Sequence, residues 1–290
     1  MIPRRLVVKA EELPIVRRCA IWLANRRYRG WAKRHAEASF GQFYAQTIGG
    51  KLARGRHHPT LGARGWEKEH GSARDWDHAS FAVRGLDRWQ KIKALGIEPH
   101  MRCVDYGCGS LRLGQHALRE LEPGHYFGLD VSDHFFTIGL RMLDPALVAE
   151  KQPYLAAISD TVLANVREWR PDFIFSNAVL QHVPPQEIPL FFARVGRMMR
   201  PGCVACIIFV AGDSVEQFGA MSWRYPADLL AETVARTVPG LTATIEPFNS
   251  AADDPRGRER MVLRLHKHGA EPPQREGLSA EARPELTPAS

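Results

Sequence analysis

The segment that most constrains the fold is residues 104–114, where an apolar run meets an acidic residue and a glycine-rich turn, Asp105-Tyr-Gly107-Cys-Gly109. Glycines let the backbone turn sharply and leave room for a ligand to contact the main chain. We expect a helix to begin near Leu111, where free N–H groups would face the polar end of that ligand. The segment therefore predicts a strand, a turn and a helix that together bind a ligand.

A second carboxylate supports this interpretation. The apolar run at residues 126–129 ends in Asp130, which follows Asp105 by 25 residues. A Gly-x-Gly pattern alone is weak evidence. A Rossmann-type fold, however, carries at about this distance the acid that accepts hydrogen bonds from ribose hydroxyls. The two elements together indicate a ligand that contains a nucleoside.

Short apolar runs alternate with helix-length segments from about residue 102 onward, which is typical of an α/β fold with a mainly parallel sheet. The first five predicted strands should run parallel with crossover helices, and the last two should form a hairpin-like pair. The predicted strands are residues 102–106, 125–129, 153–157, 172–176, 203–210, 241–247 and 261–266.

Charge divides the chain unevenly. Residues 1–100 contain 20 Lys and Arg against 9 Asp and Glu, whereas residues 101–290 contain 19 against 23. We therefore predict a basic helical N-terminal extension over residues 1–84 and a core domain over residues 85–268. The tail over residues 269–290 is rich in Pro, Glu and Ala, so we expect it to be disordered.

The N-terminal extension has its own pattern. Residues 14–31 predict a basic amphipathic helix, and Gly49-Gly50 lies in a glycine-rich stretch that we interpret as a turn. The apolar residues near one face of this predicted helix are Ile15, Cys19, Trp22 and Leu23.

The cysteines and apolar runs bear on the compartment. Five cysteines are an odd number, which favours reduced thiols, and Cys203 and Cys206 lie in a predicted strand where we expect them to be buried and inert. The longest apolar run has nine residues, far fewer than the roughly 20 that a membrane span needs. Glu11 and Glu12 precede any apolar stretch, so we expect no secretory signal and a cytoplasmic protein.

The motifs together resemble those of class I S-adenosylmethionine-dependent methyltransferases. The acid-x-Gly-x-Gly motif matches residues 105–109, and the acid of the second strand matches Asp130. Residues 172–184 look like the fourth-strand motif of the small-molecule branch (types 11, 12 and 25), and residues 198–202 resemble the turn before the fifth strand. The resemblance covers about residues 85–267. It implies a Rossmann-like sheet of seven strands, mostly parallel, in the order 3-2-1-4-5-7-6.

The resemblance also implies roles for individual residues. Gly107 and Gly109 would line the methionine half of S-adenosylmethionine, with Asp105 near its amino group, and Asp130 would hold the ribose. Asn177 would lie at the active-site end of the fourth strand. The implied cofactor-binding residues are Asp105, Gly107, Cys108, Gly109, Asp130, Val131, Asp160 and Asn177.

Two assignments leave alternatives open. Asp160 would contact adenine, but the same stretch could instead cap the following helix. His182, which with Asn177 forms the implied catalytic pair, is either a general base or a histidine that only packs or braces its loop. The histidine pairs at 57–58 and at 266 and 268 lack matching ligands, so no metal site is expected.

The expected reaction is methyl transfer to a small-molecule, sugar or lipid-linked acceptor, at oxygen or nitrogen. The stretch after Asn177 is not the Pro-Pro-aromatic signature of enzymes that methylate bases. The basic N-terminal region would cover the site, attract an acidic acceptor or contact a membrane peripherally, or else only pack on the core. The alternatives are an RNA methyltransferase that uses this region to bind phosphates, and a non-catalytic binding protein that keeps the fold.

Overall fold

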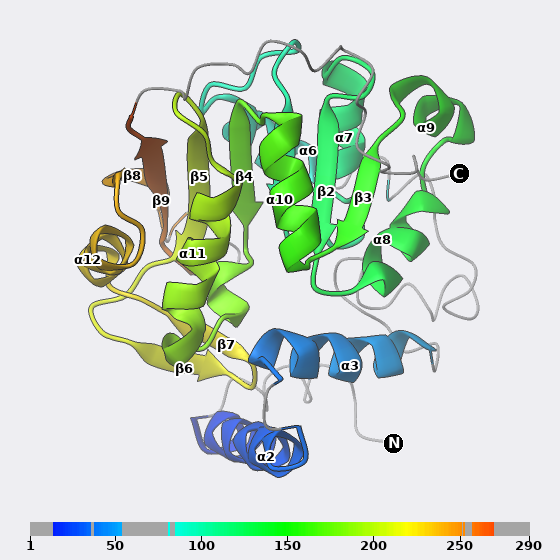
Figure 1. The fold of residues 1–290 in the computed structure, drawn as a ribbon. Coiled ribbons are helices and arrows are strands. Elements are labelled where there is room, and N and C mark those ends of the chain that lie inside the picture. The colour runs from blue at the N-terminus through cyan, green and yellow to red at the C-terminus, as the bar shows by residue number, and fades with distance from the viewer. Residues whose placement is uncertain are drawn as a thin grey trace.

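Seven strands form one sheet in the order β3-β2-β1-β4-β5-β9-β8 (Figure 1). The structure is a computed structural model, and it describes residues 14–35, 38–53, 81, 85–250, 252 and 257–269. The strands β1 to β5 run parallel, whereas β9 is antiparallel to both β5 and β8. The predicted fold class and strand order are thus confirmed. The strands are β1 (Cys103–Tyr106), β2 (Tyr126–Asp130), β3 (Tyr154–Ala157), β4 (Phe173–Asn177), β5 (Val204–Val210), β8 (Leu241–Asn249) and β9 (Arg260–Lys267).

Each predicted strand is found within two residues of its expected ends. The hairpin of β6 (Glu216–Gly219) and β7 (Ser222–Arg224) was not predicted. These strands are short, and β6 reads Glu-Gln-Phe-Gly without an apolar run. Sequence periodicity therefore gave no signal for them.

Helices cover both faces of the sheet. One face is covered by α10 (Asp160–Trp169), α11 (Ile188–Met198) and α12 (Ala227–Thr237), which lie in front in Figure 1. The other face is covered by α6 (Leu86–Lys93), α7 (Gly114–Glu120), α8 (Asp133–Leu140) and α9 (Pro145–Lys151). The central strands β1, β2, β4 and β5 are largely apolar on both faces because both faces are buried.

The core divides according to the alternation of side chains along the strands. Successive residues of a strand point to opposite faces, so Ile207 packs with α10 to α12 while Cys206 and Ile208 pack on the other side. Cys203, just before β5, belongs to the first group, so Cys203 and Cys206 are buried on opposite faces as predicted. Burial raises the pKa of both thiols to about 12, which makes them unreactive at neutral pH.

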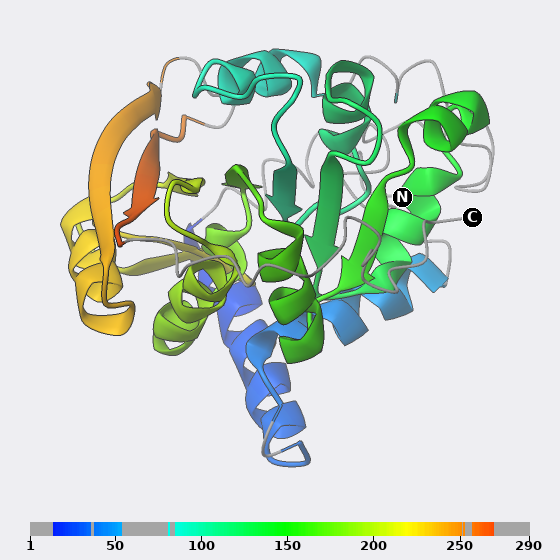
Figure 2. The same cartoon turned by 45° about the horizontal axis from the view of Figure 1, so that its top comes forward.

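Two N-terminal helices lie at the end of the sheet, α2 (Pro14–Ala32) and α3 (Phe40–Ala53) (Figures 1 and 2). The predicted helix at residues 14–31 is confirmed as α2. The turn expected at Gly49-Gly50 is wrong, because α3 continues through both glycines. A Cβ at Gly49 would make an ordinary contact of 3.7 Å with the ring of His134, so the packing of α3 on α8 does not itself require glycine there.

The histidine pair at 57–58 and the predicted tail from residue 270 onward lie outside the residues that the structure describes. Within the described ranges, no helix has both the length and the apolar character that crossing a membrane requires.

Candidate functional site

The glycine turn follows β1 and has an unusual backbone. Gly107, Gly109 and Leu111 all have positive φ angles, of 92°, 55° and 57°. The expectation that a helix begins near Leu111 is wrong, because this left-handed conformation is incompatible with an α-helix, and α7 begins at Gly114. The Leu111 side chain is fully buried, and its burial offsets part of the backbone strain.

The two glycines of the turn serve different purposes. A Cβ at Gly107 would lie 2.1 Å from Cγ2 of Val179, so only glycine lets the turn after β4 approach here. A Cβ at Gly109 would meet no atom within 4 Å. Gly109 therefore presents open main chain to the space beside the turn.

Asp130 lies at the end of β2 and faces the glycine turn. Its Oδ2 accepts a hydrogen bond of 2.8 Å from the backbone N–H of Gly109, and its Oδ1 accepts one of 3.4 Å from Ser132. Burial raises the pKa of Asp130 to about 6, against the lowering effect of these backbone donors. The turn and the second carboxylate thus adjoin each other, as the sequence indicated.

Asp105 is the second buried carboxyl group of this region. Its Oδ2 accepts a hydrogen bond of 2.9 Å from the hydroxyl of Tyr126. Burial raises the pKa of Asp105 to about 7, while the Tyr126 hydrogen bond lowers it and the charge of Asp130 raises it further. Buried carboxyl groups with raised pKa values are typical of functional sites.

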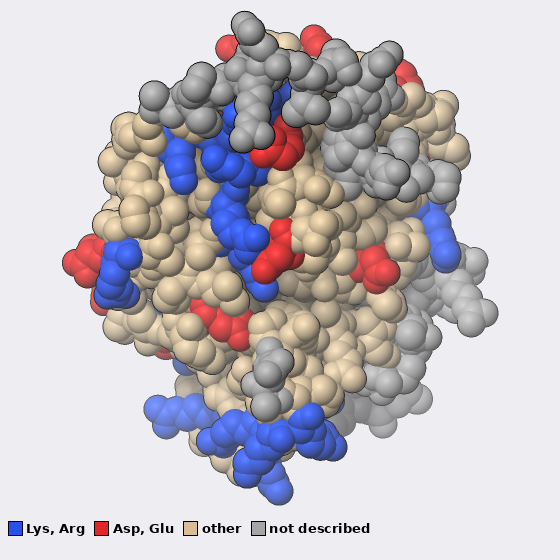
Figure 3. Space-filling model, in the orientation of Figure 1, with Lys and Arg blue, Asp and Glu red and all other residues tan. Residues whose placement is uncertain are grey.

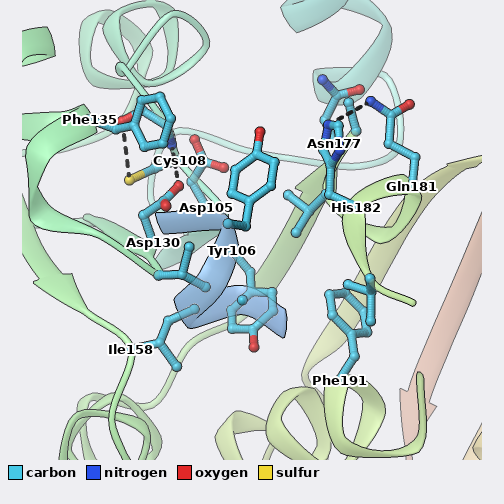
Figure 4. Close-up of a pocket in the computed structure, with 18 of the residues that line it drawn as sticks. Asp105, Tyr106, Cys108, Asp130, Phe135, Ile158, Asn177, Gln181, His182 and Phe191 are labelled. Carbon is cyan, nitrogen blue, oxygen red and sulfur yellow. Dashed lines mark hydrogen bonds between the residues drawn. The ribbon is translucent and has the colours of Figure 1, made fainter. Parts of the chain in front are cut away.

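A cavity of about 590 Å³ joins these carboxyl groups to the end of β4 (Figure 4). Its volume suits a small-molecule ligand. The carboxyl ends of β1, β2 and β4 all contribute to it, as expected for ligand sites in α/β folds. The predicted residues that line it are Asp105, Gly107, Cys108, Gly109, Asp130, Val131, Asn177 and His182.

Asp160 is the predicted site residue that does not line the cavity. It begins α10, its side chain is 79% exposed, and its carboxylate forms a 2.7 Å ion pair with Arg197. This stretch caps α10, which was the alternative to an adenine contact, because the Ser159 hydroxyl accepts a hydrogen bond from the N–H of Val162. From the same loop, it is Ile158 that lines the cavity.

His182 lies at the other end of the cavity, in the turn η1 (Leu180–His182). Its Nδ1 is 2.7 Å from the carbonyl oxygen of Met221, which can only accept, so Nδ1 carries the proton. Its Nε2 is then an acceptor, 3.1 Å from Nε2 of Gln181 (Figure 4). Burial lowers the pKa of His182, so the ring is neutral at neutral pH.

The bracing alternative for His182 describes Nδ1, whereas the general-base role stays a prediction for Nε2. Nδ1 braces the loop through Met221. The one lone pair of Nε2 accepts the Gln181 amide hydrogen bond, so Nε2 can take up a proton only when that amide has moved away. The charges of Arg258 and Arg260 lower the pKa of His182 further.

Two buried oxygens beside His182 lack partners within the described residues. They are Oδ1 of Asn177 and Oε1 of Gln181. Both residues line the cavity, and Figure 4 shows them close to His182. Because a buried unsatisfied acceptor is costly, these oxygens indicate a ligand with N–H or O–H groups.

Several cavity residues could not be identified from the sequence. Tyr44, in α3, packs against His182 with the rings tilted by 37° and 5.1 Å between their centroids, and Gly41 of the same helix also lines the cavity. Arg258 and Arg260 come from the chain leading into β9. Nothing local in the sequence links these distant segments to the glycine turn.

Positive charge is abundant around the cavity. The lining includes the acids Asp105, Asp130 and Glu187. Five guanidinium groups accompany them, those of Arg88, Arg112, Arg194, Arg258 and Arg260. Within the described ranges, no group of three or more His, Cys, Asp or Glu side chains is arranged to hold a metal ion.

Comparison with known proteins gives one family match. Residues 104–205 match the family model described as a methyltransferase domain. The search of curated proteins found no match.

Solved structures with a similar fold include three methyltransferases. Magnesium protoporphyrin IX methyltransferase from Synechocystis, with bound SAH, is 13% identical, with a TM-score of 0.47 over 66% of this chain and 83% of that one. A TehB-like SAM-dependent methyltransferase from Corynebacterium glutamicum is 17% identical, with a TM-score of 0.40 over 79% and 98%. A phosphoethanolamine N-methyltransferase from Haemonchus contortus is 13% identical, with a TM-score of 0.47 over 64% and 54%.

Proposed function

We propose that this chain, a member of the methyltransferase domain family through residues 104–205, transfers a methyl group from S-adenosylmethionine to a small anionic acceptor. The observation that carries the proposal is the set of residues that line the two ends of the cavity. It connects two buried carboxyl groups at the glycine turn with a neutral histidine and arginines at its other end.

The glycine-turn end fits the cofactor. The open main chain at Gly109 would border its methionine half, together with Gly107. The carboxylate of Asp130 would accept hydrogen bonds from the ribose hydroxyls. In this arrangement Ile158, rather than Asp160, would contact the adenine.

Asp105 would hold the cofactor's ammonium group. With a pKa of about 7, its buried carboxyl is only partly ionised at neutral pH. An ammonium group beside it would favour the ionised form and lower its pKa. The hydrogen bond from Tyr126 would keep the carboxylate oriented towards the ligand.

S-adenosylmethionine would supply a methyl group on positively charged sulfur, and in-line displacement would transfer it to the acceptor and release S-adenosylhomocysteine. The chain contributes by aligning the two ligands and excluding water. Tyr44 supports this role, because its ring covers His182 from the side of α3.

The other end of the cavity would bind the acceptor. With the acceptor in place of the Gln181 amide, Nε2 of His182 would remove a proton from an acceptor hydroxyl or amine. The oxygens of Asn177 and Gln181 would accept hydrogen bonds from it. Arginines near His182 would pair with a carboxylate or phosphate of the acceptor.

The test combines binding and turnover. We expect titration calorimetry to detect S-adenosylmethionine binding and expect Asp130→Ala to weaken it. Among small carboxylates and phosphates offered with methyl-labelled cofactor, at least one should become labelled. His182→Ala should lower this turnover by about 10²–10⁴-fold while cofactor affinity changes little. Unchanged turnover would remove His182 from the mechanism.

Two alternatives predict different results. A non-catalytic binding protein would transfer no methyl label to any acceptor, whether or not it binds S-adenosylmethionine. An RNA methyltransferase would label RNA and lose RNA affinity steeply with added salt. An absence of RNA binding at low salt would exclude that alternative.

A further inference from the structure

Helix α2 exposes large apolar side chains on one side. Ile15, Trp22 and Leu23 are 75%, 53% and 52% exposed, and Cys19, between them along the helix, is exposed as well. The spacing of these residues brings them to one helix face. Single exposed apolar residues are ordinary, but a group of large ones marks an interaction surface.

The opposite face of α2 fixes this orientation. Tyr28 packs on Phe40 and Phe43 of α3, with ring centroids 4.9 and 5.2 Å apart. The amide groups of Asn25 and Gln217 exchange two hydrogen bonds, of 3.0 and 3.1 Å, between α2 and β6. Because these contacts hold one side of the helix, the apolar side must face outward.

The exposed side of α2 is also strongly basic. No Asp or Glu occurs between Pro14 and Ala36 in the sequence. Figure 3 shows the resulting group of basic side chains at the bottom of the molecule, where α2 lies. Arg26 lies over the ring of Trp22, with its Cζ 5.4 Å from the ring centroid. The exposed basic residues of this segment are Arg17, Arg18, Arg26, Arg27, Arg29, Lys33 and Arg34.

Two kinds of partner carry the complementary negative charge, a nucleic acid and an anionic lipid surface. Phosphate contacts need only the basic side chains. The exposed aliphatic side chains of Ile15 and Leu23 gain nothing from a phosphate backbone, whereas a bilayer interface buries them together with Trp22. Arginine side chains can extend from such a helix to lipid phosphates.

We propose that α2 docks on an anionic phospholipid surface, with Ile15, Trp22 and Leu23 entering the interface and the arginines contacting headgroups. Helix α3 lies between α2 and the sheet and lines the cavity through Gly41 and Tyr44 (Figure 1). Docking through α2 therefore turns the cavity end of the molecule towards the bilayer. This orientation implies that the methyl acceptor is a lipid-linked molecule with an anionic headgroup. The assignment rests on the proposed function.

The experiment is sedimentation of the full chain with vesicles. We expect binding to vesicles of phosphatidylcholine with phosphatidylglycerol, weak binding to phosphatidylcholine alone, and weakening by salt. Replacing the three apolar residues by serine (Ile15→Ser, Trp22→Ser, Leu23→Ser) should reduce binding by about tenfold or more. The matched control is Leu229→Ser with Ile245→Ser, two residues that are each 37% exposed on α12 and β8. This control should bind like the wild type.

A second arm tests the charge and the geometry. Arg18→Gln, Arg26→Gln and Arg27→Gln together should weaken binding, whereas Arg141→Gln with Arg236→Gln should not. Bound vesicles should also slow the reaction of the Cys19 thiol with a soluble thiol reagent. Thermal melting of each variant checks that the fold is retained.

The outcomes separate the docking surface from the proposed function. Absence of binding to anionic vesicles, or equal losses in the α2 variant and its control, would overturn the docking proposal. Binding to polyuridylic acid that the serine variant retains, without vesicle binding, would assign the surface to RNA instead. Vesicle binding by a chain that fails to bind S-adenosylmethionine would leave docking intact and refute the function.

Discussion

Cofactor affinity should depend on pH in a way that the buried carboxyl groups dictate. The pKa of Asp105 is raised to about 7 and that of Asp130 to about 6, so both groups take up protons between pH 7 and pH 6. If only the ionised forms bind the cofactor, ionised Asp105 falls about fivefold and ionised Asp130 about twofold over this interval. Since a cofactor α-amino group with a pKa of about 7.7 stays protonated throughout, affinity should fall about tenfold from pH 7 to pH 6.

Titration calorimetry at constant ionic strength measures this dependence, and two variants identify its source. Asp105→Asn should bind more weakly at pH 7 but keep only the twofold dependence that Asp130 causes. Tyr126→Phe should move the profile to higher pH, because the Tyr126 hydrogen bond lowers the pKa of Asp105. A wild-type affinity that is constant from pH 6 to pH 7, or an Asp105→Asn variant with the full tenfold change, would refute the reasoning.

Other regions give sharper structural tests. Gly107→Ala should cost about 2–4 kcal/mol in denaturant unfolding, because the new Cβ meets Val179 at a positive φ, whereas Gly109→Ala should cost about 1–2 kcal/mol. Of the five thiols, only that of Cys19 should react with a thiol reagent in the native protein, as counted by absorbance, and a second fast thiol would contradict the burial. Asp160→Asn should leave cofactor affinity unchanged in calorimetry, and a large loss would restore the predicted adenine contact.

The features that could be predicted from the sequence are those set by local physics. Buried parallel strands need continuous apolar runs, which made the parallel part of the sheet visible from Cys103 to Val210. The tight turn after β1 needs glycine at 107, where any Cβ would meet Val179. Asp130 could be found because it ends an apolar run, and the end of such a strand lies at the ligand edge of an α/β sheet.

The features that could not be predicted depend on contacts between distant parts of the chain. Tyr44 lies in the N-terminal region and reaches His182 only because α3 packs across the sheet end. Arg260 begins β9, and its position in the cavity depends on where the last antiparallel strand joins the sheet. The left-handed conformation of Leu111 is similarly invisible in the sequence, because leucine rarely adopts it and only its complete burial makes it tolerable here.

The glycines of α3 explain how the N-terminal region becomes part of the site. Glycine inside a helix costs about 1 kcal/mol relative to alanine, which is why Gly49-Gly50 suggested a turn. In the structure, a Cβ at Gly41 would lie 3.3 Å from Cγ1 of Val131, and one at Gly49 would lie 3.7 Å from the ring of His134. Both neighbours belong to the segment that follows Asp130. Only the spacing at Gly41 is tight, so this glycine lets α3 approach the cofactor end of the cavity, whereas a Cβ at Gly49 would fit. The domain boundary predicted between residues 84 and 85 stays a prediction. Such a boundary would assign α3 to a different domain from the other elements that line the cavity, although α3 contributes Gly41 and Tyr44 to it.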